Sequence, residues 1–156
     1  MAKNGPMLLR LSLGIVFFWF GFLKFFPGLS TAEEVAGKTI HVISFGLISP
    51  QPGMYILACW ECAIGLGLLT KKFMVVVLGL MWVQMLGTLM PLVFFPGATW
   101  EGLLVPSLLG QYIIKNFVLI TSGIMLGGTI YGRIVTTRKE AMEAARELKE
   151  NPVTGI

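Results

Sequence analysis

Ionisable side chains inside long apolar segments are the residues of this sequence best suited to chemistry. Glu61 and Lys115 each lie within such a segment, and Lys24 lies close to the end of another. A charged group in the hydrocarbon layer of a bilayer costs about 2.5 to 3.5 kcal/mol on insertion scales, so such groups are usually turned inward, paired and functional. We therefore predict that Glu61 faces Lys115 inside a helical bundle, with Lys24 above the pair.

Further polar and aromatic side chains extend this candidate site, because amides can continue the hydrogen bonding and an indole ring can line the bundle interior. We expect two catalytic residues, Glu61 and Lys115, and four ligand contacts, Lys24, Gln84, Asn116 and Trp60. Candidate ligands are a polar headgroup, a quinone, a proton or another small molecule. The alternative is a purely structural ion pair that sets the register of the helices.

Two cysteines form a separate, secondary redox candidate. Cys59 and Cys62 have the C-x-x-C spacing of dithiol oxidoreductases. In a continuous helix, Cβ atoms at this spacing are ~5 to 6 Å apart, whereas a disulfide requires ~3.8 Å. Glu61 also points about 130° away from the mean direction of the two sulfur atoms. A role as two small packing residues is therefore the competing interpretation.

No metal site is expected from the pattern of ligand-type residues. His41 is the only histidine and lies outside the long apolar segments. Ligation of a haem by two histidines within the bundle is thereby excluded, and no other metal-ligand cluster is recognisable.

Four apolar segments must position these residues. The chain has 156 residues, of which 55% are hydrophobic and 13% charged, too apolar for a soluble domain of this size. About 20 helical residues cross a hydrocarbon layer of ~30 Å. We predict an all-α, integral membrane four-helix bundle with spans at about residues 7–26, 53–69, 73–95 and 111–131.

The distribution of lysine and arginine predicts the orientation, because cytoplasmic loops retain positive charge. With both termini cytoplasmic, most basic residues lie on one side: Lys3, Arg10, Lys71, Lys72, Arg133, Arg138, Lys139, Arg146 and Lys149. The net charge of +4 is then a signal of membrane topology. It does not indicate nucleic-acid binding, since no basic face with base-reading residues accompanies it.

The segment between the first two spans is predicted to form an outer amphipathic helix over residues 32–47. Thr31 and Glu34 have the spacing of a capping box at its start. The small residues Ser30 to Ala32 leave a second interpretation open, in which the first span is a cleaved signal peptide. Residues 96–110 are expected to form a short interfacial helix or a re-entrant segment.

The C-terminal part is predicted to form a cytoplasmic amphipathic helix. Thr137 and Glu140 repeat the capping-box spacing, with an apolar stripe after them. We accordingly divide the chain into a transmembrane domain, residues 1–132, and a cytoplasmic tail, residues 133–156.

With these residues identified, the chain resembles the DoxX-like family of small four-helix membrane proteins from about Leu8 to Leu126. The likeness rests on four short motifs in order: Arg10-Leu11-Ser12-Leu13-Gly14, Gly21-Phe22-Leu23-Lys24-Phe25-Phe26, Trp60-Glu61-Cys62-Ala63-Ile64-Gly65 and Lys115-Asn116. The resemblance implies a respiratory or redox-stress setting. Founding members of that family are described as subunits of terminal quinol oxidase or thiosulfate:quinone oxidoreductase assemblies.

These observations together lead to a functional expectation. We expect an accessory subunit of quinone-linked metabolism in a bacterial-type plasma membrane. We expect no intrinsic cofactor, and a quinone is the candidate for a bound cofactor. Glu61 would accept or relay a proton, and Lys115 would supply positive charge to an oxyanion. Expected partners are the lipid bilayer, membrane or respiratory proteins and further copies of the chain. A small transporter, a lipid- or small-molecule-binding protein and a non-catalytic assembly scaffold are the alternatives.

Overall fold

The computed structural model describes residues 4–30 and 33–150, which form helices and one small antiparallel sheet. Thr31, which the capping-box prediction and the cleavage-site interpretation both need, lies outside the described residues. The elements, in chain order, are α1 (Gly5–Leu23), α2 (Glu33–Ile43), α3 (Pro50–Thr70), α4 (Met74–Leu89), α5 (Pro91–Phe94), α6 (Pro96–Thr99), β1 (Trp100–Gly102), β2 (Val105–Pro106), α7 (Leu108–Ile114) and α8 (Asn116–Glu150).

Within the described residues, four helical segments are long and apolar enough to cross a membrane, which agrees with the all-α class. The third comprises α4 and α5, and the fourth comprises α7 and the first part of α8. Their bounds are Gly5–Leu23, Pro50–Thr70, Met74–Phe94 and Leu108–Ile130. Each overlaps one of the four expected spans.

The second and fourth spans each begin three residues earlier than expected, at Pro50 and Leu108, and proline accounts for the earlier start of the second. The second span was expected from Gly53, but α3 begins at Pro50. Proline is well tolerated in the first turn of a helix, because its missing N–H would have no intrahelical partner there. Pro50 therefore forms part of the first turn of α3.

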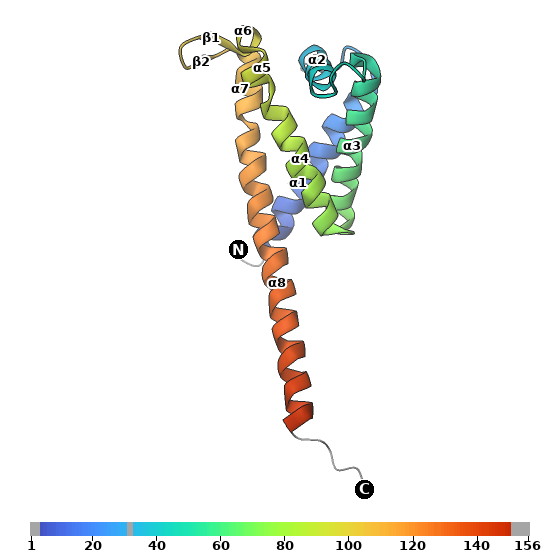
Figure 1. Ribbon diagram of the computed structural model, residues 1–156, viewed down its shortest axis with the longest axis vertical. Coiled ribbons are helices and arrows are strands. Elements are labelled where there is room, and N and C mark those ends of the chain that lie inside the picture. The colour runs from blue at the N-terminus through green and yellow to red at the C-terminus, as the bar shows by residue number, and fades with distance from the viewer. Residues whose placement is uncertain (1–3, 31–32, 151–156) are drawn as a thin grey trace.

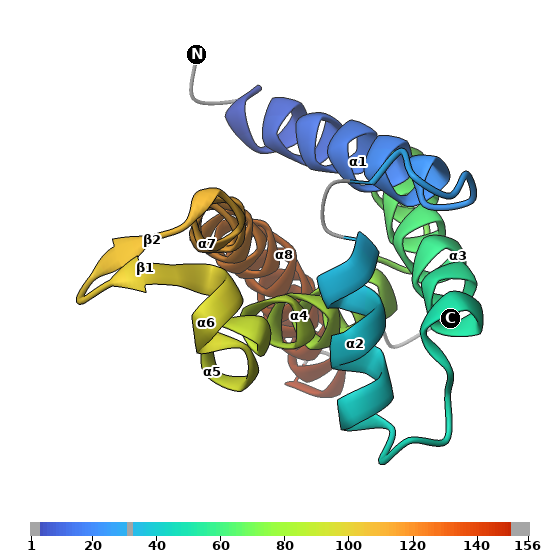
Figure 2. The same cartoon turned by 90° about the horizontal axis from the view of Figure 1, so that it is seen from above.

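α1 packs closely along α3, α4 contacts both α3 and α8, and α8 also contacts α1 (Figures 1 and 2). Glycines set the distance between α1 and α3. A Cβ atom on Gly65 would lie 2.5 Å from the backbone nitrogen of Phe18, and one on Gly21 would lie 2.8 Å from the nitrogen of Cys62. Real side chains do not tolerate such contacts, so this approach requires glycine at both positions.

The hydrophobic core fills the space between these helices. Its members come from α1, α3, α4 and α8: Leu13, Phe17, Ile64, Leu68, Val77, Leu78, Met81, Met85 and Leu126. On α3 the buried side chains recur at the spacing of one helical face, and Glu61 is one of them. The packing of this face of α3 against the core therefore places the Glu61 carboxylate inside the bundle.

The C-terminal prediction is wrong in one respect. The fourth span and the tail form one continuous helix, α8, which extends well beyond the bundle (Figure 1). At 1.5 Å per residue this helix is about 50 Å long. Helical structure is uninterrupted through Thr137 and Glu140, so the residues read as a capping box do not begin a helix. The expected boundary between the transmembrane domain and the tail, at residues 132 and 133, lies within α8, and the division itself stays a prediction.

The opposite end of the bundle carries the short elements. α2 lies across this end, against α3 and α5 (Figure 2), and occupies most of the expected outer helix. The segment expected to be a short interfacial helix contains one helical turn, α6, followed by the hairpin of β1 and β2. Ser107 then caps α7, its side-chain oxygen accepting a hydrogen bond from the Gly110 N–H at 3.1 Å.

The glycine contact between α1 and α3 can be tested by adding a methyl group. Gly65→Ala should lower the free energy of unfolding by about 1 to 3 kcal/mol, because the new Cβ meets the backbone of Phe18. Gly79→Ala is the matched control, since a Cβ there has no atom within 4 Å, and it should be neutral or stabilising by up to about 1 kcal/mol. Unfolding in detergent would be followed by circular dichroism, and equal effects of both changes would contradict the packing.

Candidate functional site

A carboxylate held by two donors forms the centre of the candidate site. Lys24 Nζ lies 2.5 Å from Glu61 Oε2, and Gln84 Nε2 donates to Glu61 Oε1 at 2.8 Å. The Lys24 and Glu61 side chains are 11% and 9% exposed, and Gln84 is buried. Both carboxylate oxygens are therefore engaged in a largely water-excluded place where α1, α3 and α4 meet.

The end of α1 brings the ammonium to this carboxylate. α1 ends at Leu23, and Lys24 caps it with its N–H bonded to the Gly21 carbonyl. A Cβ on Gly21 would lie 2.8 Å from the Glu61 Cβ, so α1 passes directly over Glu61 at this point. Lys24 lies about one helical turn beyond Gly21, so its side chain is long enough to reach back to the Glu61 carboxylate.

Pairing is required by the surroundings of Glu61. The α3 positions one turn away on the same face, Ala58 and Ile64, have no exposed surface. An ionised carboxylate in such surroundings is costly unless an opposite charge and hydrogen-bond donors compensate. Lys24 supplies the charge, and Gln84 satisfies the remaining oxygen.

Lys115 does not belong to this site, so the expected Glu61–Lys115 pair is wrong. Lys115 is exposed, and its Nζ lies 4.8 Å from the centroid of the Tyr112 ring. The inward positions of α7 are Gly110 and Ile113. Two residues beyond Ile113, Lys115 is rotated by about 200° and faces outward.

The other expected ligand contacts have different roles. Trp60 lies between α3 and α4, where its Nε1 donates to the Leu80 carbonyl at 3.2 Å, so the indole joins two helices. Asn116 begins α8 and is half-buried, and it is not among the two partners of Glu61. The structure thus unites Glu61, Lys24 and Gln84 and leaves Lys115 and Asn116 apart from them.

The cysteines are two free thiols. Cys59 is exposed, and Cys62 is half-buried, with its Sγ 3.8 Å from the Phe18 carbonyl oxygen across the contact between α1 and α3. α3 is continuous through both positions, so the local break that a disulfide needs is absent from this segment. Cys62 acts here as a small packing residue.

Arg10 has a structural role that the sequence interpretation missed. Its Nη1 donates to the carbonyl of Leu68 and, at 3.0 Å, to that of Leu69. These carbonyls lie in the last turn of α3, where no intrahelical donor is available. Arg10 therefore fastens the start of α1 to the end of α3. The signal available in the sequence was the place of Arg10 inside an apolar span, which the predictions used for orientation and for the family resemblance but not for helix packing.

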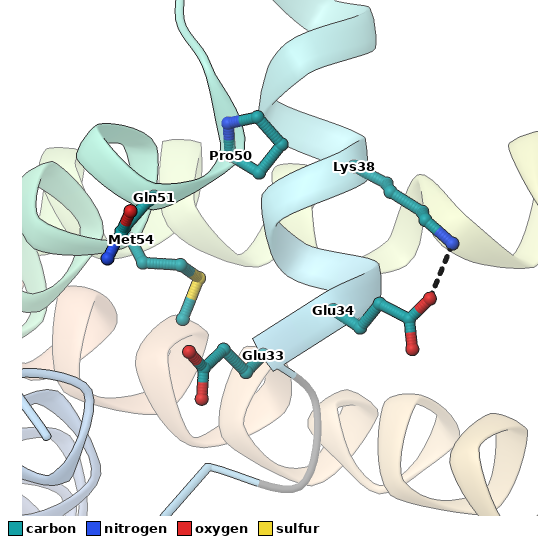
Figure 3. Close-up of a pocket in the computed structure, with 6 residues that line it drawn as sticks. All are labelled: Glu33, Glu34, Lys38, Pro50, Gln51 and Met54. Carbon is teal, nitrogen blue, oxygen red and sulfur yellow. Dashed lines mark hydrogen bonds and ion pairs between the residues drawn. The ribbon is translucent and has the colours of Figure 1, made fainter. Parts of the chain in front are cut away.

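A hollow of about 330 Å³ opens between α2 and the start of α3 (Figure 3). It is lined by Glu33, Glu34, Lys38, Pro50, Gln51 and Met54. Both of its carboxylates have partners: Glu33 accepts from the Gly28 N–H at 2.7 Å, and Glu34 pairs with Lys38 at 2.6 Å. The hydrogen bond and charge of Lys38 hold the pKa of Glu34 below its usual value. This exposed hollow is distinct from the buried site of Glu61.

Comparison of the chain with models of known protein families, with curated proteins and with solved structures finds no match in any of the three. The resemblance to the DoxX-like family therefore stays a prediction, resting on the motifs quoted above.

The pairing of Glu61 can be tested with a double-mutant cycle. Glu61→Gln or Lys24→Met alone should cost about 3 to 5 kcal/mol of stability, because each leaves a buried charge without its partner. The double variant should recover much of this loss, with a coupling energy well above about 0.5 kcal/mol.

The same cycle with Lys115→Met in place of Lys24→Met is the control. Lys115 faces away from Glu61, so the two changes should add within about 0.5 kcal/mol. Chemical unfolding in detergent measures both cycles. Coupling to Lys115 and not to Lys24 would contradict the arrangement described here.

Proposed function

We propose that this chain is a multi-pass protein of a bacterial-type plasma membrane with both termini in the cytoplasm. Four helices of sufficient length and apolarity support insertion. The start of α1, the turn between α3 and α4 and the free length of α8 lie at the same end of the bundle (Figure 1). Lys71 and Lys72 occupy that turn, and a cytoplasmic side rich in lysine and arginine is the usual arrangement.

We further propose that the chain is a DoxX-like accessory subunit that binds the headgroup of a quinone or quinol beside Glu61. The single observation that carries this proposal is the carboxylate held between Lys24 and Gln84 within apolar segments. Intramembrane ionisable residues mark ligand or proton sites by default. Two residues from the second and third motifs of the resemblance, Lys24 and Glu61, pair with each other, whereas Lys115 and Asn116 of the fourth motif lie apart from them.

The chemistry of a quinol suits these groups. Glu61 would accept a hydrogen bond from one quinol hydroxyl and take that proton when the quinol is oxidised, while the second proton and both electrons pass to a partner redox subunit. Lys24, in the role first assigned to Lys115, would stabilise negative charge on the quinone oxygen. Gln84 would orient the carboxylate. The chain itself would bind the headgroup and move a proton.

A non-catalytic assembly scaffold is the second candidate, and a specific observation favours it. In the part of the chain that the structure describes, every buried polar side-chain atom has a hydrogen-bond partner. The Lys24–Glu61–Gln84 group then needs no ligand to be stable, and it would serve to fix the register of α1, α3 and α4. The double variant Glu61→Gln with Lys24→Met separates the two candidate functions by its stability and its biological activity. A scaffold regains both stability and biological activity, whereas a ligand site regains stability alone.

Reporter fusions test the proposed topology. A reporter active only in the cytoplasm should give a signal when inserted after Lys72 and none after Trp100, because α4 separates these points. A periplasmic reporter should give the reverse pattern. The same signal from both positions would contradict the four-span arrangement.

Mass spectrometry of the protein purified from its native membrane tests quinone binding. The wild type should retain a quinone through gel filtration, and Glu61→Gln should retain about tenfold less, because a charge-assisted hydrogen bond is worth about 1.5 to 3 kcal/mol. Gln84→Met, which leaves the ion pair in place, should show a smaller loss. Gly79→Ala is the control and should bind as the wild type does. A folded wild type without quinone, or equal retention by Glu61→Gln, would refute the proposal.

A further inference from the structure

An outward-facing polar stripe on α7 calls for a partner outside the chain. Leu108, Gln111, Tyr112 and Lys115 follow one another at i, i+3, i+4 and i+7, so they share one face of the helix. All four are exposed. The opposite face, with Gly110 and Ile113, packs against the protein. We call Gln111, Tyr112 and Lys115 the α7 stripe.

In a bilayer, the stripe would lie inside the hydrocarbon layer but close to the headgroups, because its residues fall in the first two turns of the apolar segment Leu108–Ile130. Lys115 is about 10 Å along the helix from Leu108, where the apolar segment begins. Its ammonium does not point deeper, because it lies over the Tyr112 ring, one turn closer to that end. Helical side chains lean toward the N-terminus of their helix, and a lysine stem is long enough to carry the charge most of the remaining way to the lipid headgroups.

No anion within the described part of the chain neutralises Lys115. The ion pairs within the bundle and its α2 end, Lys24 with Glu61 and Lys38 with Glu34, do not include Lys115. An acidic residue in a span of a second copy is also a poor partner. Glu61 is the only acidic residue in the four apolar segments, and it is buried within its own bundle, where Lys24 already balances its charge.

We propose that the α7 stripe is a binding site for the phosphate of an anionic phospholipid in the leaflet at the end of the bundle that carries α2. The Lys115 ammonium would pair with a phosphate oxygen, and the Tyr112 hydroxyl and Gln111 amide would donate hydrogen bonds to the phosphate or to the glycerol oxygens. Exposed Leu108 would contact the upper part of the acyl chains. The site rests on the membrane insertion proposed above and is independent of quinone binding.

Native mass spectrometry of the intact chain tests this site. Protein that is released from a phosphatidylglycerol bilayer should keep a bound lipid molecule. Protein that is released from a phosphatidylcholine bilayer should keep about tenfold less bound lipid. Lys115→Met should reduce retention of phosphatidylglycerol about tenfold, since it removes a charge-assisted contact. Lys115→Arg should restore it. Lys38→Met, which removes an exposed lysine from the same end of the bundle, is the matched control and should have no effect.

Three results would overturn the site. Equal retention of the two lipids by the wild type would show that the anionic charge is not recognised, and this comparison needs no variant. Unchanged retention by Lys115→Met would place the lipid elsewhere. A wild-type dimer or a complex with another protein that dissociates in Lys115→Met would assign the stripe to a protein partner. Failure of insertion itself would appear separately in the reporter fusions.

Discussion

A charge inside an apolar bundle has to be neutralised by another part of the protein, and this requirement organises the structure around Glu61. The carboxylate lies on the buried face of α3, among side chains without exposed surface. Lys24 from the end of α1 and Gln84 from α4 each take one of its oxygens. Three helices are thereby held in a single register, because sliding any one of them would leave a charge or an amide without its partner.

The close contact of α1 with α3 makes this pairing possible. Gly21 and Gly65 remove the side chains that would separate the two backbones, and Arg10 fastens the other end of the pair by bonding to the last carbonyls of α3. Packing between helices in an apolar solvent depends on such close approach and on interhelical hydrogen bonds. The glycines and the polar residues therefore act together, because the glycines allow the short distance between the helices at which the polar side chains can bond.

Lys24 and Lys115 illustrate how rotation about a helix axis changes the role of a residue type. Both lie in apolar surroundings within reach of the same end of the bundle. Lys24 follows the glycine face of α1 and enters the interior, where it pairs with Glu61. Lys115 is on the face of α7 opposite Ile113, where its ammonium lies over the Tyr112 ring. A lysine of the first kind stabilises or serves a buried site, and one of the second kind is available to the surroundings.

The sequence by itself determined the all-α class, the four apolar segments and the polar residues within them, because length and hydrophobicity are local properties that add along the chain. Glu61, Lys24 and Gln84 could be selected in this way, since each is a polar group in an apolar stretch. The tertiary structure decided which of them meet. The partner of Glu61 depends on the rotation of α7 and on the glycine contact between α1 and α3, neither of which is a local property. The union of the fourth span with the tail in α8, and the hairpin after α6, were likewise outside the local pattern. A capping box at Thr137 favours a helix start, but it does not interrupt a helix that already passes through it.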